Sequence, residues 1–289
     1  MTKRLLVNTG NGMFGRALIE QLLDREDVEV RAMVRDRSKF PLTGGNLVVV
    51  EADMDDPPSL EPVTRDITHA FVTSPMDEHI TEREIAMFDA CRANGNPQII
   101  SIAGAVDHAG DHLVSLHDAA RAHLMASGLP WTIVSPNSVM ETSLMSFKDQ
   151  IAMGQMFGVS GDGRIGLVAL EDVARVMAEV VVGEGHEGKN YYCTGPAAVS
   201  LGEVAEAFTR VLPHPVQYVN MTDEDFIQML LDYAGFKSKE EAEIGVMCHL
   251  RAWREGRASM VTDTVQKVTG QDAMSVEDWI SEERDVFVR

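Results

Sequence analysis

The chain has 289 residues, of which 45% are hydrophobic and 24% charged, and it contains 23 Gly and 3 Cys. This composition excludes disordered, collagen-like and disulfide-scaffold proteins. The cysteines, Cys91, Cys193 and Cys248, form no CxxC pair and indicate free thiols in a reducing compartment. No apolar run approaches the roughly 20 residues needed to cross a bilayer, and the run after Arg4 is too short for a signal peptide. We therefore expect a cytoplasmic protein.

The formal net charge is −20, from 25 basic and 45 acidic side chains. Such an acidic surface repels nucleic acid and anionic membranes, so we expect neither as a partner. Residues 1–40 differ from the rest of the chain, because they hold 8 basic and 6 acidic side chains. Two interpretations stay open: this segment receives an anionic ligand, or its charges cluster by chance.

Short apolar, β-branched runs alternate with helical segments through the first 135 residues or so. The predicted strands are Arg4–Asn8, Val28–Val34, Leu47–Val50, His69–Val72, Gln98–Ile102 and Trp131–Ser135. The predicted helices between them are Met13–Arg25, Ser59–Val63, Asp77–Asn94 and His112–Ser127. Strands that are apolar throughout suit a sheet covered on both faces. This alternation predicts an α/β fold with a doubly wound parallel sheet of the Rossmann type.

Helix start signals dominate from about residue 140, with short strands predicted at Lys189–Thr194 and Val216–Asn220. In three places a hydroxyl residue is followed three positions later by a carboxylate: Ser200 with Glu203, Thr222 with Asp225, and Ser238 with Glu241. We predict an NAD(P)-binding domain over residues 1–138 and a smaller, mostly helical, substrate-binding lobe over residues 139–289. Segments around residues 156–195 are expected to return to the sheet.

A glycine-rich turn follows the first predicted strand and leads directly into a helix, in the pattern GxGxxG. Here Gly10 permits a tight turn, Gly12 lets the backbone approach a pyrophosphate, and Gly15 allows close packing of helix on strand. The helix N-terminus adds free amides and the positive end of a dipole. The turn therefore predicts a dinucleotide site formed by Gly10, Asn11, Gly12, Met13 and Phe14. A tight turn without a ligand is the alternative.

The end of the second strand indicates which dinucleotide is bound. Arg35 stands at the strand end, with Arg37 and Lys39 close behind, and a guanidinium there can hold a 2′-phosphate. An acidic residue at this place would instead hold the ribose of NAD, and Asp36 argues in that direction. We predict NADP(H), held by Arg35 and Lys39. The alternative is that these are ordinary exposed charges of a turn.

Several motifs, in this order along nearly the whole chain, resemble the NmrA-like branch of the atypical short-chain dehydrogenases/reductases. The segments that carry the resemblance are residues 30–35, 51–56, 126–137, 161–164, 170–174, 188–191, 194–196 and 269–270. The resemblance implies that the cofactor lies across the glycine turn and that Arg35 holds the 2′-phosphate. It also implies that Asp53 lies near the adenine, and that Thr73 and Ser74 pass the nicotinamide ribose.

The tyrosine and lysine that usually protonate substrate in short-chain dehydrogenases are missing. All four tyrosines lie beyond residue 190, and the one that has a lysine four positions later, Tyr233 with Lys237, lies in the predicted second lobe and not on the helix that precedes Ser127. The corresponding positions hold His117 and Arg121. In one interpretation His117 donates a proton or binds a substrate oxygen, while Arg121 tunes the imidazole or fixes the nicotinamide ribose. In the other, His117 only caps or packs its helix.

Two further segments carry candidate side chains. After the sixth strand we expect Asn137 and Met140 to contact substrate, although methionines at these spacings also suit a core. The segment Asp107–His112 is histidine-rich, and His108 and His112 have the spacing of a helical metal site. Because Gly110 disfavours a helix there and hydride transfer needs no metal, we expect a loop over the active site and no metal.

Taken together, the residues and the resemblance predict an NADPH-dependent reductase with a small, electron-poor, aromatic or conjugated substrate such as a quinone, azo compound, enone, imine or carbonyl. The alternative is a non-catalytic NADP(H)-binding redox sensor, which the missing tyrosine and lysine would suit. The sequence leaves open whether the protein is a monomer or a homodimer.

Overall fold

The computed structural model describes residues 2–106 and 112–288. The chain divides into two compact units of nearly equal size. The first contains the described residues up to Ala103, together with His112–Ser135 and Val173–Tyr191, and the second contains the other described residues. The chain thus leaves the first unit at the end of the sixth strand and returns to it with residues 173–191.

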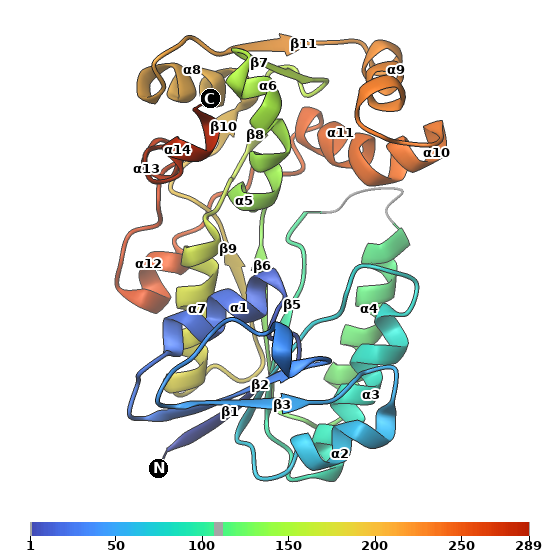
Figure 1. Ribbon diagram of the computed structural model, residues 1–289, viewed down its shortest axis with the longest axis vertical. Coiled ribbons are helices and arrows are strands. Elements are labelled where there is room, and N and C mark those ends of the chain that lie inside the picture. The colour runs from blue at the N-terminus through green and yellow to red at the C-terminus, as the bar shows by residue number, and fades with distance from the viewer. Residues whose placement is uncertain (1, 107–111, 289) are drawn as a thin grey trace. The chain divides into compact units, whose positions relative to one another are not determined.

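The first unit is built on a seven-stranded sheet with helices on both faces (Figure 1). Its strands are β1 Lys3–Val7, β2 Val28–Val34, β3 Leu47–Glu51, β4 His69–Val72, β5 Gln98–Ile102, β6 Trp131–Pro136 and β9 Lys189–Cys193, the last two ending in the second unit. Its helices are α1 Met13–Leu22, α2 Leu60–Val63, α3 Ile80–Ala93, α4 His112–Ala126 and α7 Leu170–Val182, with 3₁₀ turns at Arg37–Lys39 and Pro57–Ser59.

The strand order is β3-β2-β1-β4-β5-β6-β9, and the strands pair in parallel. The order of winding reverses between β1 and β4, where Val7 is paired with Phe71. In a doubly wound sheet this reversal opens a crevice at the carboxyl ends of the strands, which is where ligands bind. The predicted Rossmann fold is therefore confirmed, and it places the glycine turn beside this crevice.

Helices α3 and α4 cover one face of the sheet, and α1 and α7 cover the other (Figure 1). On the α3–α4 face, Met87 and Phe88 of α3 and Leu124 of α4 pack with Leu6 and Ile99 of the sheet in one buried cluster. Because successive side chains of a strand point to opposite faces, Ser101 shares this face with Ile99. The same layer that holds the core thus also holds a buried hydroxyl.

The predicted and observed elements of the first unit agree in order and type, and they differ at their ends. Helix α1 ends at Leu22 rather than at residue 25, because Asp24 has a left-handed conformation with φ of 63°. Asn46 then accepts a hydrogen bond from the Asp24 amide and donates to the carbonyls of Leu22 and Val28. One side chain from beyond the next strand therefore stabilises the end of this helix, which the local sequence does not reveal.

The second unit is mostly helical and has its own core. Its helices are α5 Met140–Ser143, α6 Lys148–Ala152, α8 Leu201–Val211, α9 Asp223–Tyr233, α10 Lys239–Ala242, α11 Cys248–Arg254, α12 Thr264–Thr269, α13 Val276–Glu282 and α14 Arg284–Phe287, with a 3₁₀ turn at Met145–Phe147 and a π-helical turn at Glu243–Met247. Its short strands are β7 Gln155–Gly158, β8 Arg164–Ile165, β10 Val199–Ser200 and β11 Gln217–Asn220.

The three predicted start signals of the second unit are helix caps. The Ser200 hydroxyl accepts from the Glu203 amide, and the Glu203 carboxylate accepts from the Ser200 amide, which together form a capping box on α8. Thr222 and Ser238 cap α9 and α10 through one hydrogen bond each. Within residues 2–106 and 112–288, no helix combines the length and the apolar character needed to span a membrane.

His69 offers a test of how burial in the first unit couples stability to pH. Its imidazole is 4% exposed at the start of β4, and burial, with a smaller effect of Lys3, lowers its pKa to about 4 from the ordinary 6.5. The unfolded chain therefore binds a proton that the folded chain rejects between pH 6.5 and 4. Up to about 3 kcal/mol of unfolding free energy should be lost as the pH falls through this window.

Chemical denaturation at a series of pH values checks this expectation. His69→Asn keeps a hydrogen-bonding side chain beside Thr68 but cannot titrate, so its unfolding free energy should fall less steeply below pH 6.5 than that of the wild type. His79→Asn, which changes an exposed imidazole, should retain the wild-type slope. Equal slopes for His69→Asn and the wild type would contradict the assigned cause.

Candidate cofactor and catalytic site

The glycine turn brings α1 against β1 more closely than any side chain would permit. A Cβ atom on Gly15 would lie 2.3 Å from the carbonyl oxygen of Thr9, so helix and strand could not keep their positions with alanine there. A Cβ atom on Gly10 would lie 3.3 Å from Ala32 and from the Met33 carbonyl oxygen. None of the three turn glycines has a positive φ. Close packing, rather than the tight-turn conformation expected for Gly10, therefore accounts for glycine here.

The N-terminus of α1 is open to an anion. Its N-cap is Gly12, which has no side chain to accept from the helix amides, and the first turn contains no acidic residue. Beside it the Thr9 hydroxyl is buried without a hydrogen-bond partner in the described part of the chain. Free amides at a helix start, together with a buried unsatisfied hydroxyl, fit a bound phosphate. Gly10, Asn11, Gly12, Met13 and Phe14 thus stay the residues that would hold the pyrophosphate.

The three cationic side chains after β2 differ in their hydrogen-bond and ion-pair partners. Arg37 donates to the Val49 carbonyl oxygen of β3 at 2.8 Å, and Lys39 forms an ion pair with Asp36 at 3.1 Å. Arg35 is exposed and has no partner among the residues that the structure describes. Arg35 is therefore the better placed of the two residues predicted to hold a 2′-phosphate, and Lys39 would have to exchange its exposed pair with Asp36.

Asp36, which argued for NAD in the sequence, is committed to the turn itself. Its carboxylate accepts from the hydroxyl of Ser38 at 2.6 Å and from the amide of the same residue at 3.0 Å. These bonds to Ser38, with Lys39 beside them, lower the pKa of Asp36. A carboxylate that is already satisfied in this way is a poor partner for a ribose hydroxyl.

Asn8, which the sequence analysis did not single out, joins the ends of β1 and β4 at the crevice. Its side-chain amide donates to the Thr73 carbonyl oxygen at 2.8 Å, and its oxygen accepts from the Thr73 amide at 3.1 Å. The Ser74 hydroxyl is buried and donates to the Pro75 carbonyl oxygen, whereas no partner in the described residues occupies the Thr73 hydroxyl. Of the two residues expected near the nicotinamide ribose, Thr73 has the freer side chain.

Arg83 of α3 connects the loop after β3 to the loop after β4. Its guanidinium binds Asp55 through Nε at 2.6 Å and Nη2 at 2.9 Å, and it binds both oxygens of Asp77 through Nη1. These carboxylates raise the pKa of Arg83, and the arginine in turn lowers the pKa of both. Asp53, expected near the adenine, accepts from the Asp55 amide and so belongs to the same loop. The sequence gives no signal for a pairing across 28 residues.

His117 and Arg121, both on α4, each lie beside a carboxylate. Nδ1 of His117 lies 3.1 Å from a carboxylate oxygen of Glu84 on α3, and Nε2 lies 3.2 Å from the sulfur of Met76 in the loop after β4. Arg121 forms an ion pair with Asp118, three residues earlier on α4. Arg121 is thus paired with Asp118, and its role in tuning His117 or in fixing the nicotinamide ribose stays a prediction.

Asn137 and Met140 are held by the second unit and do not form a substrate surface within it. The Asn137 side chain donates to the Ala258 carbonyl oxygen at 2.9 Å and accepts from the Ser138 amide at 2.8 Å. Met140 is fully buried in the core of this unit. Both residues are therefore explained by packing, which corrects the expectation that they contact substrate.

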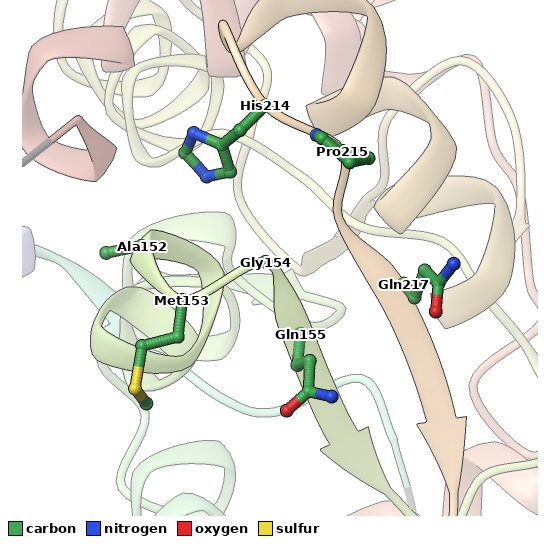
Figure 2. A pocket seen from close by; sticks show the side chains of 7 residues that line it. All are labelled: Ala152, Met153, Gly154, Gln155, His214, Pro215 and Gln217. Carbon is green, nitrogen blue, oxygen red and sulfur yellow. The ribbon is translucent and has the colours of Figure 1, made fainter.

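A pocket of about 430 Å³ also lies in the second unit, between the end of α6 and the segment that leads into β11 (Figure 2). His214 is its titratable side chain, and its Nε2 lies 3.0 Å from the Ile151 carbonyl oxygen. Exposed Met153, Gln155 and Gln217 complete much of the lining. Its lining has no GxGxxG turn and no acid–base pair, so the first unit remains the better candidate for the cofactor and catalytic site.

The histidine-rich segment around His108 lies outside the described residues, so neither the loop nor the metal interpretation is addressed there. Within the ranges that are described, no group of three or more metal-ligating side chains comes together.

Replacing Arg83 tests whether the two loops that it joins belong to the cofactor site. In Arg83→Ala, Asp55 and Asp77 lose their shared partner, and we expect NADPH binding to weaken roughly 10-fold, or about 1.4 kcal/mol. Arg83→Lys should give a smaller loss, because its ammonium group keeps a positive charge near Asp55 and Asp77 although it cannot bind both carboxylates bidentately. Titration calorimetry measures both. Arg65→Ala, which removes an exposed pair with Glu61, is the control and should bind normally.

Comparison with known proteins assigns the family. The model of a family described as NAD(P)H-binding matches residues 10–183. An NAD(P)H azoreductase from Xenophilus azovorans is 27% identical over 274 residues, which cover 93% of this chain and 94% of the relative. A (4-alkanoyl-5-oxo-2,5-dihydrofuran-3-yl)methyl phosphate reductase from Streptomyces griseus is 27% identical over 285 residues, or 98% of this chain and 99% of the relative.

Among solved structures, an NADPH-dependent quinone oxidoreductase complexed with NADPH, from Escherichia coli, superposes with a TM-score of 0.84 at 21% identity. The superposition covers 96% of this chain and 99% of that one, and it supports the fold. The family match spans the glycine turn, Arg35, Arg83 and His117, and it includes more than half of the chain. The protein therefore belongs to the NAD(P)H-binding family, which confirms the resemblance drawn from its sequence.

Proposed function

We propose that the protein is an NADPH-dependent reductase that passes hydride to a small, electron-poor, aromatic or conjugated substrate. The observation that carries this proposal is the open N-terminus of α1 together with Arg35, which has no partner within residues 2–106 and 112–288, both at the crevice edge of the first unit. Amides and a free guanidinium together recognise a pyrophosphate and a 2′-phosphate. When bound, NADPH supplies the hydride.

The substrate class is inferred from the relatives. Two of them are named as reductases, one of azo compounds and one of a dihydrofuranyl-methyl phosphate, and a third protein with the same fold is a quinone oxidoreductase. Azo compounds, conjugated lactones and quinones are all electron-poor acceptors whose reduction needs a hydride and a proton.

His117 is the residue that we propose for the proton. It lies on α4, its Nε2 is directed at an exposed methionine in the loop after β4, and no hydrogen bond to a backbone group holds it in the described part of the chain. An imidazole titrates near neutral pH and is suited to give a proton to a reduced substrate. The alternative, a non-catalytic NADP(H) sensor, is favoured by the missing tyrosine and lysine.

Arg35 decides cofactor preference in this proposal. Arg35→Ala removes a charge-assisted contact, so the dissociation constant for NADPH should rise roughly 10- to 100-fold while that for NADH stays unchanged. Arg37→Ala is the matched control, because the Arg37 guanidinium is bound to β3, and it should leave the preference intact. Equal losses for both cofactors in Arg35→Ala, or a wild-type preference for NADH, would contradict the assignment.

Turnover separates the reductase from the sensor. NADPH oxidation is followed by absorbance with quinones, azo dyes, enones, imines and aldehydes as acceptors. We expect turnover with at least one acceptor, and a loss of kcat of about 100-fold in His117→Ala where the reduced product needs a proton from the protein. Tight NADPH binding without turnover across this panel would instead support the sensor.

A further inference from the structure

A buried carboxylate faces His117 from the neighbouring helix. Glu84 of α3 is 1% exposed, and its Oε1 lies 3.1 Å from Nδ1 of His117, which is 14% exposed. Neither Glu84 oxygen has a conventional hydrogen bond within residues 2–106 and 112–288, nor does Nδ1 of His117, since the N–H direction of the ring misses the nearby oxygen.

Contacts between α3 and α4 hold these two residues in register. The Thr81 hydroxyl donates to the Leu116 carbonyl oxygen at 2.9 Å. Glu84 follows Thr81 by nearly one helical turn, and His117 is the residue after Leu116, so the same contact sets carboxylate and imidazole opposite each other. A second pair, Asp89 with His123, spans the same two helices at 3.1 Å, but it is partly exposed to solvent.

Burial makes the contact with His117 essential for the ionised carboxylate. A charge removed from water is strongly unfavourable unless a partner compensates it, and neither Glu84 oxygen has a hydrogen-bond partner among the described residues. The charged groups near this end of the helices are already paired: Asp77 binds Arg83, and Arg121 binds Asp118. Glu84 is therefore the charged group that contacts the imidazole.

The other ring nitrogen faces outward. Nε2 of His117 lies beside the sulfur of Met76, a weak hydrogen-bond acceptor on a side chain that is 60% exposed. Met76 lies in the loop after β4, at the carboxyl edge of the sheet where ligands of this fold bind. A ligand oxygen or nitrogen could take the place of this weak acceptor without leaving a buried group unpaired.

We propose that Glu84 is the positioning residue for His117: it holds the proton of His117 on Nδ1 and thereby presents Nε2 as the atom that gives a proton to substrate. The anion formed when substrate accepts hydride takes the Nε2 proton of the imidazolium. The ring is then neutral, with Nδ1–H directed at Glu84, and water returns a proton to Nε2. This step rests on the proposed reductase function, whereas the hold of Glu84 on the ring does not.

The tautomer of His117 tests the hold directly. In long-range ¹H–¹⁵N correlation spectra of the ¹⁵N-labelled protein, neutral His117 should show a protonated Nδ1 and an unprotonated Nε2, the reverse of the tautomer that free histidine prefers. The signals are assigned by their loss in His117→Gln. In Glu84→Gln the preference should disappear, because an amide both donates and accepts. Asp89→Asn, which changes the partly exposed pair, should leave the His117 signals unchanged.

Kinetics test whether the hold matters for turnover. With an acceptor from the panel above, Glu84→Gln should lower kcat about 10-fold while KM and NADPH affinity stay unchanged, and it should have little further effect in a His117→Ala background. Asp89→Asn should have wild-type kcat. A merely structural contact between α3 and α4 would change stability and leave kcat unchanged.

Each result bears on one of the two proposals. A wild-type His117 protonated on Nε2, an unchanged tautomer in Glu84→Gln, or a changed tautomer with unchanged kcat would each overturn the role of Glu84. The wild-type spectrum decides the tautomer even where Glu84→Gln does not fold. Absence of turnover with every acceptor would contradict the reductase, and the tautomer alone would then decide whether Glu84 holds His117.

Discussion

The approach of α1 to β1 at Gly15 is the constraint on which the cofactor site depends. The Thr9 carbonyl oxygen occupies the space that a Cβ on Gly15 would need, so the helix can start directly over the strand end. That placement sets the uncapped N-terminus of α1 at the point where the strand order reverses. The neighbouring strand ends are tied to the same edge by side chains, Asn8 between β1 and β4 and Arg83 between the following loops. A phosphate-binding helix start is useful only if the edge around it is held in this way.

Charge in this part of the molecule is sorted by what each group already binds. The chain carries a net charge of −20, yet its first 40 residues are slightly basic. Most of those cations are engaged, as Arg37 is by β3 and Lys39 by Asp36, and Arg35 is exposed without a partner in the described residues. A guanidinium that does not have to break an existing ion pair can bind a phosphate with most of its intrinsic affinity. The local charge therefore predicts that residues 1–40 bind an anion, and the pattern of hydrogen bonds and ion pairs indicates Arg35 as the residue that binds it.

The pair of Glu84 and His117 changes how the missing tyrosine and lysine are understood. In the usual motif, the lysine cation makes the tyrosine hydroxyl more acidic. In the proposed pair, the carboxylate accepts a hydrogen bond from one ring nitrogen of the imidazole and so fixes which nitrogen faces the substrate. Both arrangements present one polar atom at the carboxyl edge of the sheet. The absence of one motif is therefore compatible with acid–base chemistry carried by other residue types on the same helix pair. The unusual feature is the Glu84 carboxylate rather than the histidine, because a buried charge rarely has one neighbouring group as its sole compensation.

The sequence by itself determined the order and type of the elements in the first 135 residues, the glycine turn and the caps of α8, α9 and α10, because each depends on neighbours within a few residues. Strand β2 and the capping box on Ser200 were predictable for this reason. The end of α1 was not, since Asn46 reaches it from beyond β2. Asn137 and Met140 follow a strand at the expected edge. Only the tertiary structure shows that Asn137 hydrogen-bonds to the Ala258 carbonyl oxygen and that Met140 is buried in the core. Only the tertiary structure could bring Arg83 to Asp55, and Glu84 to His117, because contacts between residues about 30 positions apart depend on how helices pack on the sheet and leave no local pattern.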